Sequence, residues 1–172
     1  QDPEFAPEFA LSPERQALVA ETPFNNHVVH GTRGQPVEDL VTITREVSAE
    51  LDDMFANSST GFSERMAESD QPFFLYHCTR GGHWKNYPNP RFKGKSPAKY
   101  PFKDCIVEMD DIIGRLVRTL DETGQLENTL IFVTSDNGPA VEPWPDAGYT
   151  PFRGGIGGTW EGSVRAPGIA YW

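Results

Sequence analysis

The run Pro-Phe-Phe-Leu-Tyr-His-Cys at residues 72–78 and the run Leu-Ile-Phe-Val at residues 130–133 decide the expected fold. Each is a short, continuous apolar stretch, which is typical of a strand buried on both faces. Between them, residues 102–123 repeat apolar side chains at steps of three and four and end before Gly124, which predicts a long helix. Strand, helix and strand in this order form a right-handed crossover in a parallel sheet. We therefore expect an α/β fold with a mixed, mainly parallel sheet and flanking helices.

Residues 1–70 differ in character from the rest of the chain. We expect this segment to be acidic, partly irregular and partly helical, with a helix over 37–55, a break at 57–61 and a short helix over 62–69. The net charge of the whole chain is -10. Residues 1–71 hold 14 Asp and Glu against 4 Arg and no Lys, so they carry all of it.

This composition narrows the classes of partner. Binding to nucleic acid or to an anionic membrane is disfavoured, because such binding needs an excess of cationic side chains. No run approaches the roughly 20 apolar residues of a membrane span, so we expect no integral membrane segment. No signal peptide is visible either, and the compartment stays open. The two cysteines, Cys78 and Cys105, are expected to be free, partly buried thiols.

Polar side chains follow both predicted strands. Asp136, Asn137 and Gly138 come directly after the second strand, and His83 follows the first. Ligands of such sheets bind outside the carboxyl ends of the strands. The carboxylate and the amide carbonyl are hard oxygen ligands suited to calcium or magnesium, and an imidazole can donate to an anionic oxygen. The alternatives are a plain Asp-Asn-Gly turn and a solvated surface histidine.

Two further clusters are candidates for function. Seven cationic residues and no acid lie between residues 80 and 103, where they could steer an anionic substrate or merely offset the acidic segment. Five glycines lie between residues 152 and 162, which indicates close approach of the backbone to another group. Neither a phosphate-binding loop nor a serine hydrolase elbow is present.

These motifs, in this order, resemble the sulfatases, particularly the arylsulfatase branch of the alkaline-phosphatase-like superfamily. The resemblance runs from about residue 71 to residue 172, which we interpret as the central part of a sulfatase catalytic domain. The stretches that carry it are residues 72–76, 95–101 leading into 107–111, 134–139, and 159–167.

The resemblance implies an activity and a set of site residues. It implies a sulfuric ester hydrolase that cleaves a small-molecule or glycan sulfate ester, and a periplasmic, secreted or lysosomal location. Asp136 and Asn137 would ligate a divalent cation, usually calcium, and His83 would contact the sulfate ester near its leaving oxygen, as a substrate-binding and catalytic residue. Cation and donors would stabilise the negative charge that develops during cleavage.

Departures from the family pattern modify this expectation. The family uses a formylglycine made in a Cys/Ser-x-Pro-x-Arg motif, and neither Cys78 nor Cys105 lies in one. The chain therefore resembles a fragment, and we expect it to be inactive by itself. Ile156 stands where the family has a sulfate-contacting lysine, and Ser163 stands in place of a glycine. An alternative is a non-catalytic protein that binds sulfated ligands; a phosphatase of the same superfamily is disfavoured, because its nucleophile and two-metal site are not visible.

Overall fold

The computed structural model describes residues 26–83, 86–141 and 146–172. The chain divides into two compact units, residues 1–49 and residues 50–172, and each is described by itself. Within the described residues, no helix is both long and apolar enough to span a membrane.

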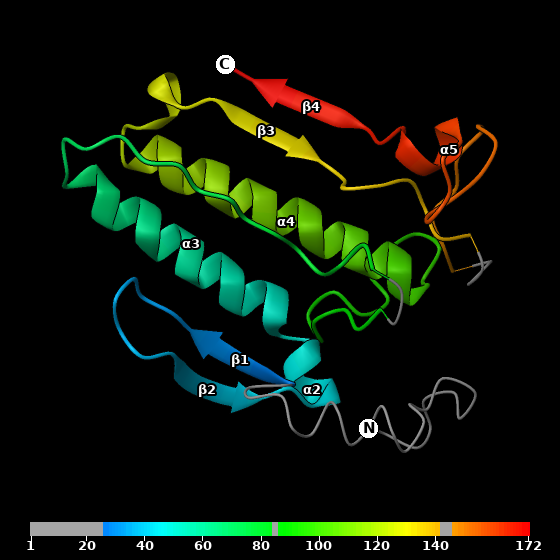
Figure 1. Cartoon of the computed structure of the whole chain (residues 1–172), viewed down its shortest axis with the longest axis horizontal. Helices are drawn as coiled ribbons and strands as arrows, with labels where there is room; N and C mark the ends of the chain where they lie inside the picture. Colours follow the sequence, from blue (N-terminus) through cyan, green and yellow to red (C-terminus); the bar gives the residue numbers. More distant parts are fainter. Residues whose placement is uncertain (1–25, 84–85, 142–145) are drawn as a thin grey trace. The chain divides into compact units, whose positions relative to one another are not determined.

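The first unit contains a two-stranded antiparallel sheet and a short helix (Figure 1). Strands β1 (His27–His30) and β2 (Glu38–Thr42) pair across a turn that contains Gly34 at a φ of +80°. Helix α2 (Arg45–Ser48) begins after Thr44, whose hydroxyl accepts the backbone N–H of Val47 at 3.2 Å.

The helix predicted over 37–55 is wrong over residues 37–44, whereas residues 45–48 and 51–55 are helical. The Gly34 turn folds the chain back, so residues 38–42 pair with β1 and satisfy their backbone groups between strands. Val41 and Thr42 are β-branched, which suits a strand better than a helix.

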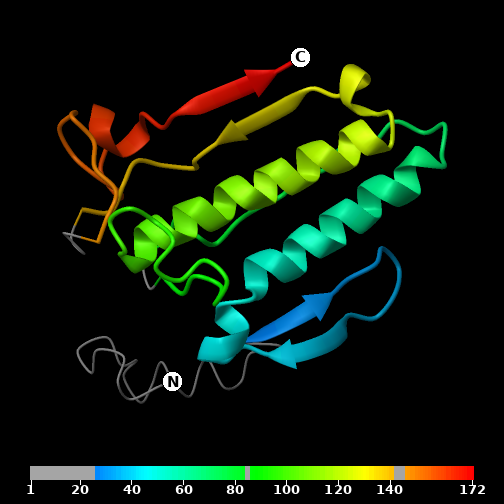
Figure 2. The same ribbon diagram turned by 180° about the vertical axis from the view of Figure 1, so that it is seen from behind.

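The second unit is built around two helices that pack against each other, α3 (Leu51–Ala67) and α4 (Pro101–Glu122) (Figures 1 and 2). The break predicted at 57–61 is wrong, because α3 runs through it without interruption. Ala56, Ser59 and Ser63 recur at three- and four-residue steps and are buried. The Ser63 hydroxyl donates to the Ser59 carbonyl at 3.1 Å. Ser59 of the run 57–61 thus lies, with Ala56 and Ser63, on a narrow buried stripe along the helix.

Helix α4 confirms the prediction over residues 102–123. Proline opens the helix at its first position, and Gly124 ends it at a φ of +73°. Cys105, Ile112 and Leu120 are buried and belong to the core of this unit. Ile106, by contrast with these three residues, is 42% exposed.

The remaining elements form the end of the chain. The 3-10 helix η2 (Leu126–Asn128) leads into β3 (Ile131–Thr134), and helix α5 (Glu161–Val164) leads into β4 (Gly168–Tyr171). Strand β3 therefore confirms the position of the second predicted strand to within one residue. Its predicted burial on both faces is wrong, because Leu130 and Phe132 are 63% and 65% exposed. Strand β3 pairs with β4, and this pair is antiparallel.

The first predicted strand, residues 73–78, is extended but belongs to no sheet within the described part of the chain. It runs in the same direction as β3 and is joined to it through α4, as a parallel crossover requires (Figure 1). The expectation of burial on both faces is wrong here. Phe74 and Tyr76 are 85% and 78% exposed, whereas Phe73, Leu75 and His77 alternate with them and are half-buried. Only one face of the segment is covered, so only the inward set of side chains is shielded from water.

Candidate functional site

The candidate site is built on the turn that follows β3. Gly138 donates its backbone N–H to the Ser163 carbonyl at 2.8 Å. A Cβ at residue 138 would lie 1.9 Å from the Gly162 carbonyl oxygen, so no other side chain fits this position. Asp136 and Asn137 are therefore held at the carboxyl end of β3 by a close contact with helix α5.

The glycine-rich segment supports this turn from the other side. Gly162 donates its N–H to the Arg153 carbonyl at 2.8 Å, and Ile156 donates its N–H to the Pro139 carbonyl at 3.1 Å. The glycine cluster thus serves backbone-to-backbone packing, as its composition indicates. Ile156 is 43% exposed, and its backbone hydrogen bond to Pro139 places it beside the turn over residues 136–138 (the Asp136 turn).

Ser163 stands where the resemblance places a glycine, so its hydroxyl is an additional group at this position. Its Oγ atom is buried and makes no hydrogen bond to the described residues. A Cβ added at Gly158 would lie 2.7 Å from this oxygen, and one at Gly154 would lie 3.0 Å from it. The hydroxyl therefore occupies space that two glycines leave open.

Asp136 and Asn137 present oxygen atoms that suit a cation. Asp136 is exposed, and among the described residues neither its carboxylate nor the Asn137 Oδ1 atom accepts a hydrogen bond. The Asn137 amide group donates to the Gly138 carbonyl at 2.9 Å, which fixes the side chain. Two hard oxygen ligands fit part of a calcium or magnesium shell, which takes six or more. The described residues hold no cluster of three or more His, Cys, Asp or Glu side chains around a common point, so the remaining ligands are not among those residue types here.

The extended segment brings a second set of side chains toward this turn. Interactions with Cys78, followed by burial and the charge of Asp136, raise the pKa of Tyr76 above its ordinary value. Tyr76 therefore lies within electrostatic reach of Asp136, although their residue numbers differ by sixty. The composition of the run 72–78 indicates a core strand, and it gave no signal for this proximity.

His83 lies in the turn that follows the extended segment. It is exposed, and its backbone N–H donates to the Arg80 carbonyl at 2.9 Å. No hydrogen bond or ion pair of the described residues joins His83 to Asp136 or Asn137. The structure thus brings Asp136 and Asn137 together, and it leaves the role of His83 as a prediction.

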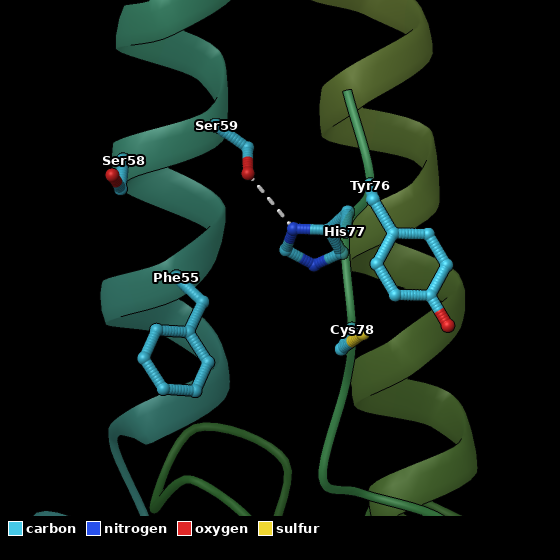
Figure 3. A pocket seen from close by; sticks show the side chains of 6 residues that line it. All are labelled: Phe55, Ser58, Ser59, Tyr76, His77 and Cys78. Carbon is cyan, nitrogen blue, oxygen red and sulfur yellow. Dashed lines mark hydrogen bonds between the residues drawn. The ribbon is translucent and has the colours of Figure 1, made fainter. Parts of the chain in front are cut away.

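A hollow of about 300 Å³ opens between α3 and the extended segment, lined by Phe55, Ser58, Ser59, Tyr76, His77 and Cys78 (Figure 3). The His77 ring points toward α3, and its Nδ1 atom lies 2.9 Å from the Ser59 hydroxyl; Tyr76 points the opposite way. Burial lowers the pKa of His77, so its neutral form is favoured. Its Nε2 atom is buried and has no hydrogen-bond partner among the described residues.

Three buried carboxylates hold the loop over residues 80–100, and sequence reasoning missed all three. Asp52 accepts the N–H of Arg80 at 2.7 Å, and Glu108 accepts the N–H of Asn89 at 2.9 Å. Asp104 accepts the N–H groups of Gly94 at 2.7 Å and Ser96 at 2.8 Å. The available signal was the position of Asp104 in the first turn of a helix opened by proline, directly after a loop without acids.

The surroundings of these carboxylates set their pKa values in opposite directions. Burial raises the pKa of Glu108 above its usual range, against the opposing effect of the Asn89 N–H. Burial also acts to raise the pKa of Asp104, but the hydrogen bonds from Ser96 and Gly94 outweigh it, and the pKa is lowered. Asp104 is therefore held as an anion by the loop that it binds.

Comparison with known proteins identifies relatives of this arrangement. The family model described as Sulfatase matches residues 18–172. The chain is 36% identical to human arylsulfatase A over 60% of its length and 33% identical to mouse N-acetylgalactosamine-6-sulfatase over 81% of its length. Among solved structures, the PsFucS1 sulfatase from Pseudoalteromonas sp. covers 84% of the chain at 48% identity with a TM-score of 0.81.

These relatives are much longer than the chain. The chain spans 20% of arylsulfatase A, 27% of N-acetylgalactosamine-6-sulfatase and 29% of the PsFucS1 structure. A solved structure whose title concerns the metabolism of multiple glycosaminoglycans by Bacteroides thetaiotaomicron matches 83% of the chain at 29% identity and a TM-score of 0.65. The similarity of the solved structures confirms the α/β fold class that the strand and helix pattern predicts.

Proposed function

Because this chain belongs to the sulfatase family, we propose that it forms part of the site of a sulfate ester hydrolase in which Asp136 and Asn137 bind a divalent cation. Calcium is the cation that the resemblance favours. The observation that carries the proposal is the close contact of Gly138 with Gly162, which holds two oxygen ligands on one edge of the molecule. A plain surface turn needs no such contact.

The proposed site divides its tasks among few residues. Asp136 and Asn137 position the cation, which supplies positive charge to the oxygens of the sulfate group when bound. His83 donates a hydrogen bond to the sulfate ester near its leaving oxygen. These groups act where negative charge develops during cleavage of the ester bond.

The proposed substrate class is a sulfate ester of a glycan. Several curated relatives are N-acetylgalactosamine-6-sulfatases, among them those from mouse and from Bacteroides thetaiotaomicron, and one solved structure is described with the metabolism of multiple glycosaminoglycans. A further solved structure, 25% identical with a TM-score of 0.65, is described in complex with neocarrahexaose. A small aryl sulfate is the simpler probe of the same chemistry.

Calcium titration by calorimetry tests the cation site. We expect the 172-residue chain to bind calcium in the roughly millimolar range, because two ligands are a small part of a full shell. Asp136→Asn should abolish the heat of binding. The matched control is Asp110→Asn, since Asp110 is also an exposed aspartate of this unit. If both variants bind calcium like the parent chain, residues 136–138 are a plain turn.

Activity of the chain by itself is the second test. The sequence has no Cys/Ser-x-Pro-x-Arg motif from which the formylglycine nucleophile of the family could form. We therefore expect no hydrolysis of 4-methylumbelliferyl sulfate by the purified 172-residue chain. Release of the fluorescent product, blocked by a sulfatase inhibitor, would contradict this expectation.

Ile156 favours one alternative, a protein that binds sulfated ligands without cleaving them. Its side chain cannot donate to an oxyanion, although its backbone lies beside the Asp136 turn. Titration with a sulfated disaccharide, with free sulfate followed by ion chromatography, separates the two functions. Binding without sulfate release, in any form of the protein that carries the formylglycine, would favour the alternative.

A further inference from the structure

Three lysines near the candidate site have no partner among the described residues. Lys93, Lys95 and Lys99 are exposed and form no ion pair there. The neighbouring cations differ: Arg91 pairs with Asp53 at 2.9 Å, and the Lys103 Nζ atom donates to the Ala147 carbonyl at 2.5 Å. Residues 93–99 thus carry three exposed cations and no acid, in a chain whose net charge is -10.

The backbone that carries these lysines is fixed. Asp104, only 2% exposed, accepts the N–H groups of Gly94 and Ser96, which alternate with the lysines. The Lys99 N–H donates to the Ser96 hydroxyl at 3.0 Å, and the Lys95 N–H donates to the Phe92 carbonyl at 2.9 Å. A ligand that contacts the three ammonium groups therefore does not have to order the loop first, which lowers the entropic cost of binding.

The lysine segment enters α4 at the end that faces the candidate site. Phe102 donates its N–H to the Asp146 carboxylate at 3.0 Å, directly after the segment ends. A Cβ at Gly148 would lie 2.8 Å from the Pro139 side chain and 3.6 Å from the Phe102 ring, so these three residues are close neighbours. Pro139 follows the Asp136 turn directly. The end of β3 and the start of α4 lie at the same end of the unit in both views (Figures 1 and 2).

We propose that Lys93, Lys95 and Lys99 form a subsite for the neighbouring anionic groups of a sulfated polysaccharide, outside the position of the cleaved ester. Tyr100, which is 44% exposed and follows Lys99, offers an aromatic face to a sugar ring. The inference rests on the proposed function, and it specifies a substrate with several anionic groups along its chain.

The test measures binding of a fluorescently labelled chondroitin sulfate octasaccharide to the 172-residue chain by anisotropy, in EDTA and at low salt. The triple variant Lys93→Gln/Lys95→Gln/Lys99→Gln should weaken binding at least about tenfold and should flatten its dependence on salt. The matched control is Arg33→Gln/Arg65→Gln/Arg118→Gln, which removes the same charge at three other exposed positions. It should weaken binding less than about twofold, because none of its cations belongs to residues 93–99.

Several outcomes overturn the inference. These are no binding by the parent chain, equal weakening by both triple variants, and equally tight binding of a DNA oligonucleotide of the same charge. Urea unfolding of both triple variants should match that of the parent chain, since all six side chains are exposed. Because EDTA removes the cation, Asp136→Asn should leave octasaccharide binding unchanged. Loss of calcium binding and loss of the lysine subsite are therefore separate results.

Discussion

The loops at the site edge and the extended segment beside them are built in opposite ways. The edge loops (residues 89–100, 136–141 and 146–163) are held by buried carboxylates and by backbone contacts between glycines. The extended segment (residues 73–78) has no strand partner in the described part of the chain, and Phe74 and Tyr76 are largely exposed. The backbone of the irregular loops therefore has more of its hydrogen-bond partners than the backbone of the extended segment, although the sequence of that segment is typical of a core strand.

The difference follows from where each region finds its partners. Asp104 lies only ten residues from Gly94, so the loop satisfies its N–H groups within a short stretch of the chain. A strand needs a neighbouring strand, which can come from any distance along a polypeptide. The relatives of this chain are about three times its length, so a sulfatase of that size contains further segments from which a neighbouring strand can come.

The largest loss of stability is expected when the contact between the Asp136 turn and α5 is disrupted. Gly138→Ala should lower the free energy of unfolding by about 3 kcal/mol, because its Cβ would overlap the Gly162 carbonyl oxygen. Gly82→Ala is the matched control, since a Cβ there meets nothing within 4 Å. Urea unfolding followed by circular dichroism measures both variants. Equal stability of the two would show that residues 136–138 are not held against α5.

The extended segment offers a test with adjacent residues. Phe73→Ala should cost about 2 kcal/mol, because the Phe73 ring packs edge-on against Phe62 at 5.5 Å between centroids. Phe74→Ala should change stability by less than about 0.5 kcal/mol, since this ring is 85% exposed.

The same two variants also report on self-association. Phe74→Ala should reduce association of the chain at high concentration, measured by sedimentation velocity, because it removes an exposed aromatic group beside unpaired backbone. A large loss of stability in Phe74→Ala would mean that the outer face of the segment is already covered.

Periodic patterns and local motifs were enough to predict part of this structure. The α4 helix and β3 follow from apolar spacing, and the Asp136–Gly138 turn was placed at the end of its strand. The first part of the helix predicted over 37–55 was wrong, because pairing between β1 and β2 depends on a turn at Gly34 and outweighs a short helical pattern. The predicted break at 57–61 was wrong for a related reason, since burial of Ser59 and Ser63 favours a helix where local preference does not.

The candidate site was less accessible from sequence than the fold. Asp136 and Asn137 stand next to each other, so their joint position needs no tertiary information. Asp52 anchors Arg80 across twenty-eight positions, and no local pattern indicates such a pair. No local pattern indicates the electrostatic interaction of Tyr76 with Asp136 either, because the two residues are sixty positions apart.

The third prediction tests whether buried carboxylates are what completes the edge loops. Asp104→Asn should lower stability by about 1.5 kcal/mol at pH 7, because the amide group cannot accept both the Gly94 and Ser96 N–H groups. Asp110→Asn on the exposed side of the same helix should have no measurable effect.

The contribution of the Asp104 carboxylate to the free energy of unfolding should depend on pH. The pKa of Asp104 is lower in the folded state than its ordinary value, so its stabilisation is present at neutral pH and is lost as the pH falls below about 4. The difference between the parent chain and Asp104→Asn should therefore shrink in acid, as measured by urea unfolding at a series of pH values. A difference that stays constant down to pH 3 would exclude the ionised carboxylate as its source.

The last prediction concerns the alkylation rates of the two cysteines, which report how accessible the extended segment and the start of α4 are. Cys78 lies in the extended segment and is exposed, whereas Cys105 lies beside Asp104 and is buried. Burial, with smaller contributions from Glu108 and Asp52, raises the pKa of Cys105 to about 12. At pH 8 iodoacetamide should therefore modify Cys78 at least about a hundredfold faster than Cys105, because only the thiolate reacts.

Peptide mass spectrometry after timed alkylation resolves the two sites, and urea provides the unfolded control in which both react. Asp104→Asn should speed the modification of Cys105 in the folded chain and leave that of Cys78 unchanged, since it loosens only the loop that covers the start of α4. Similar rates at both cysteines in the parent chain would contradict the comparison. They would mean that the start of α4 opens as readily as the extended segment, and that the hydrogen bonds to Asp104 do not close the edge loops.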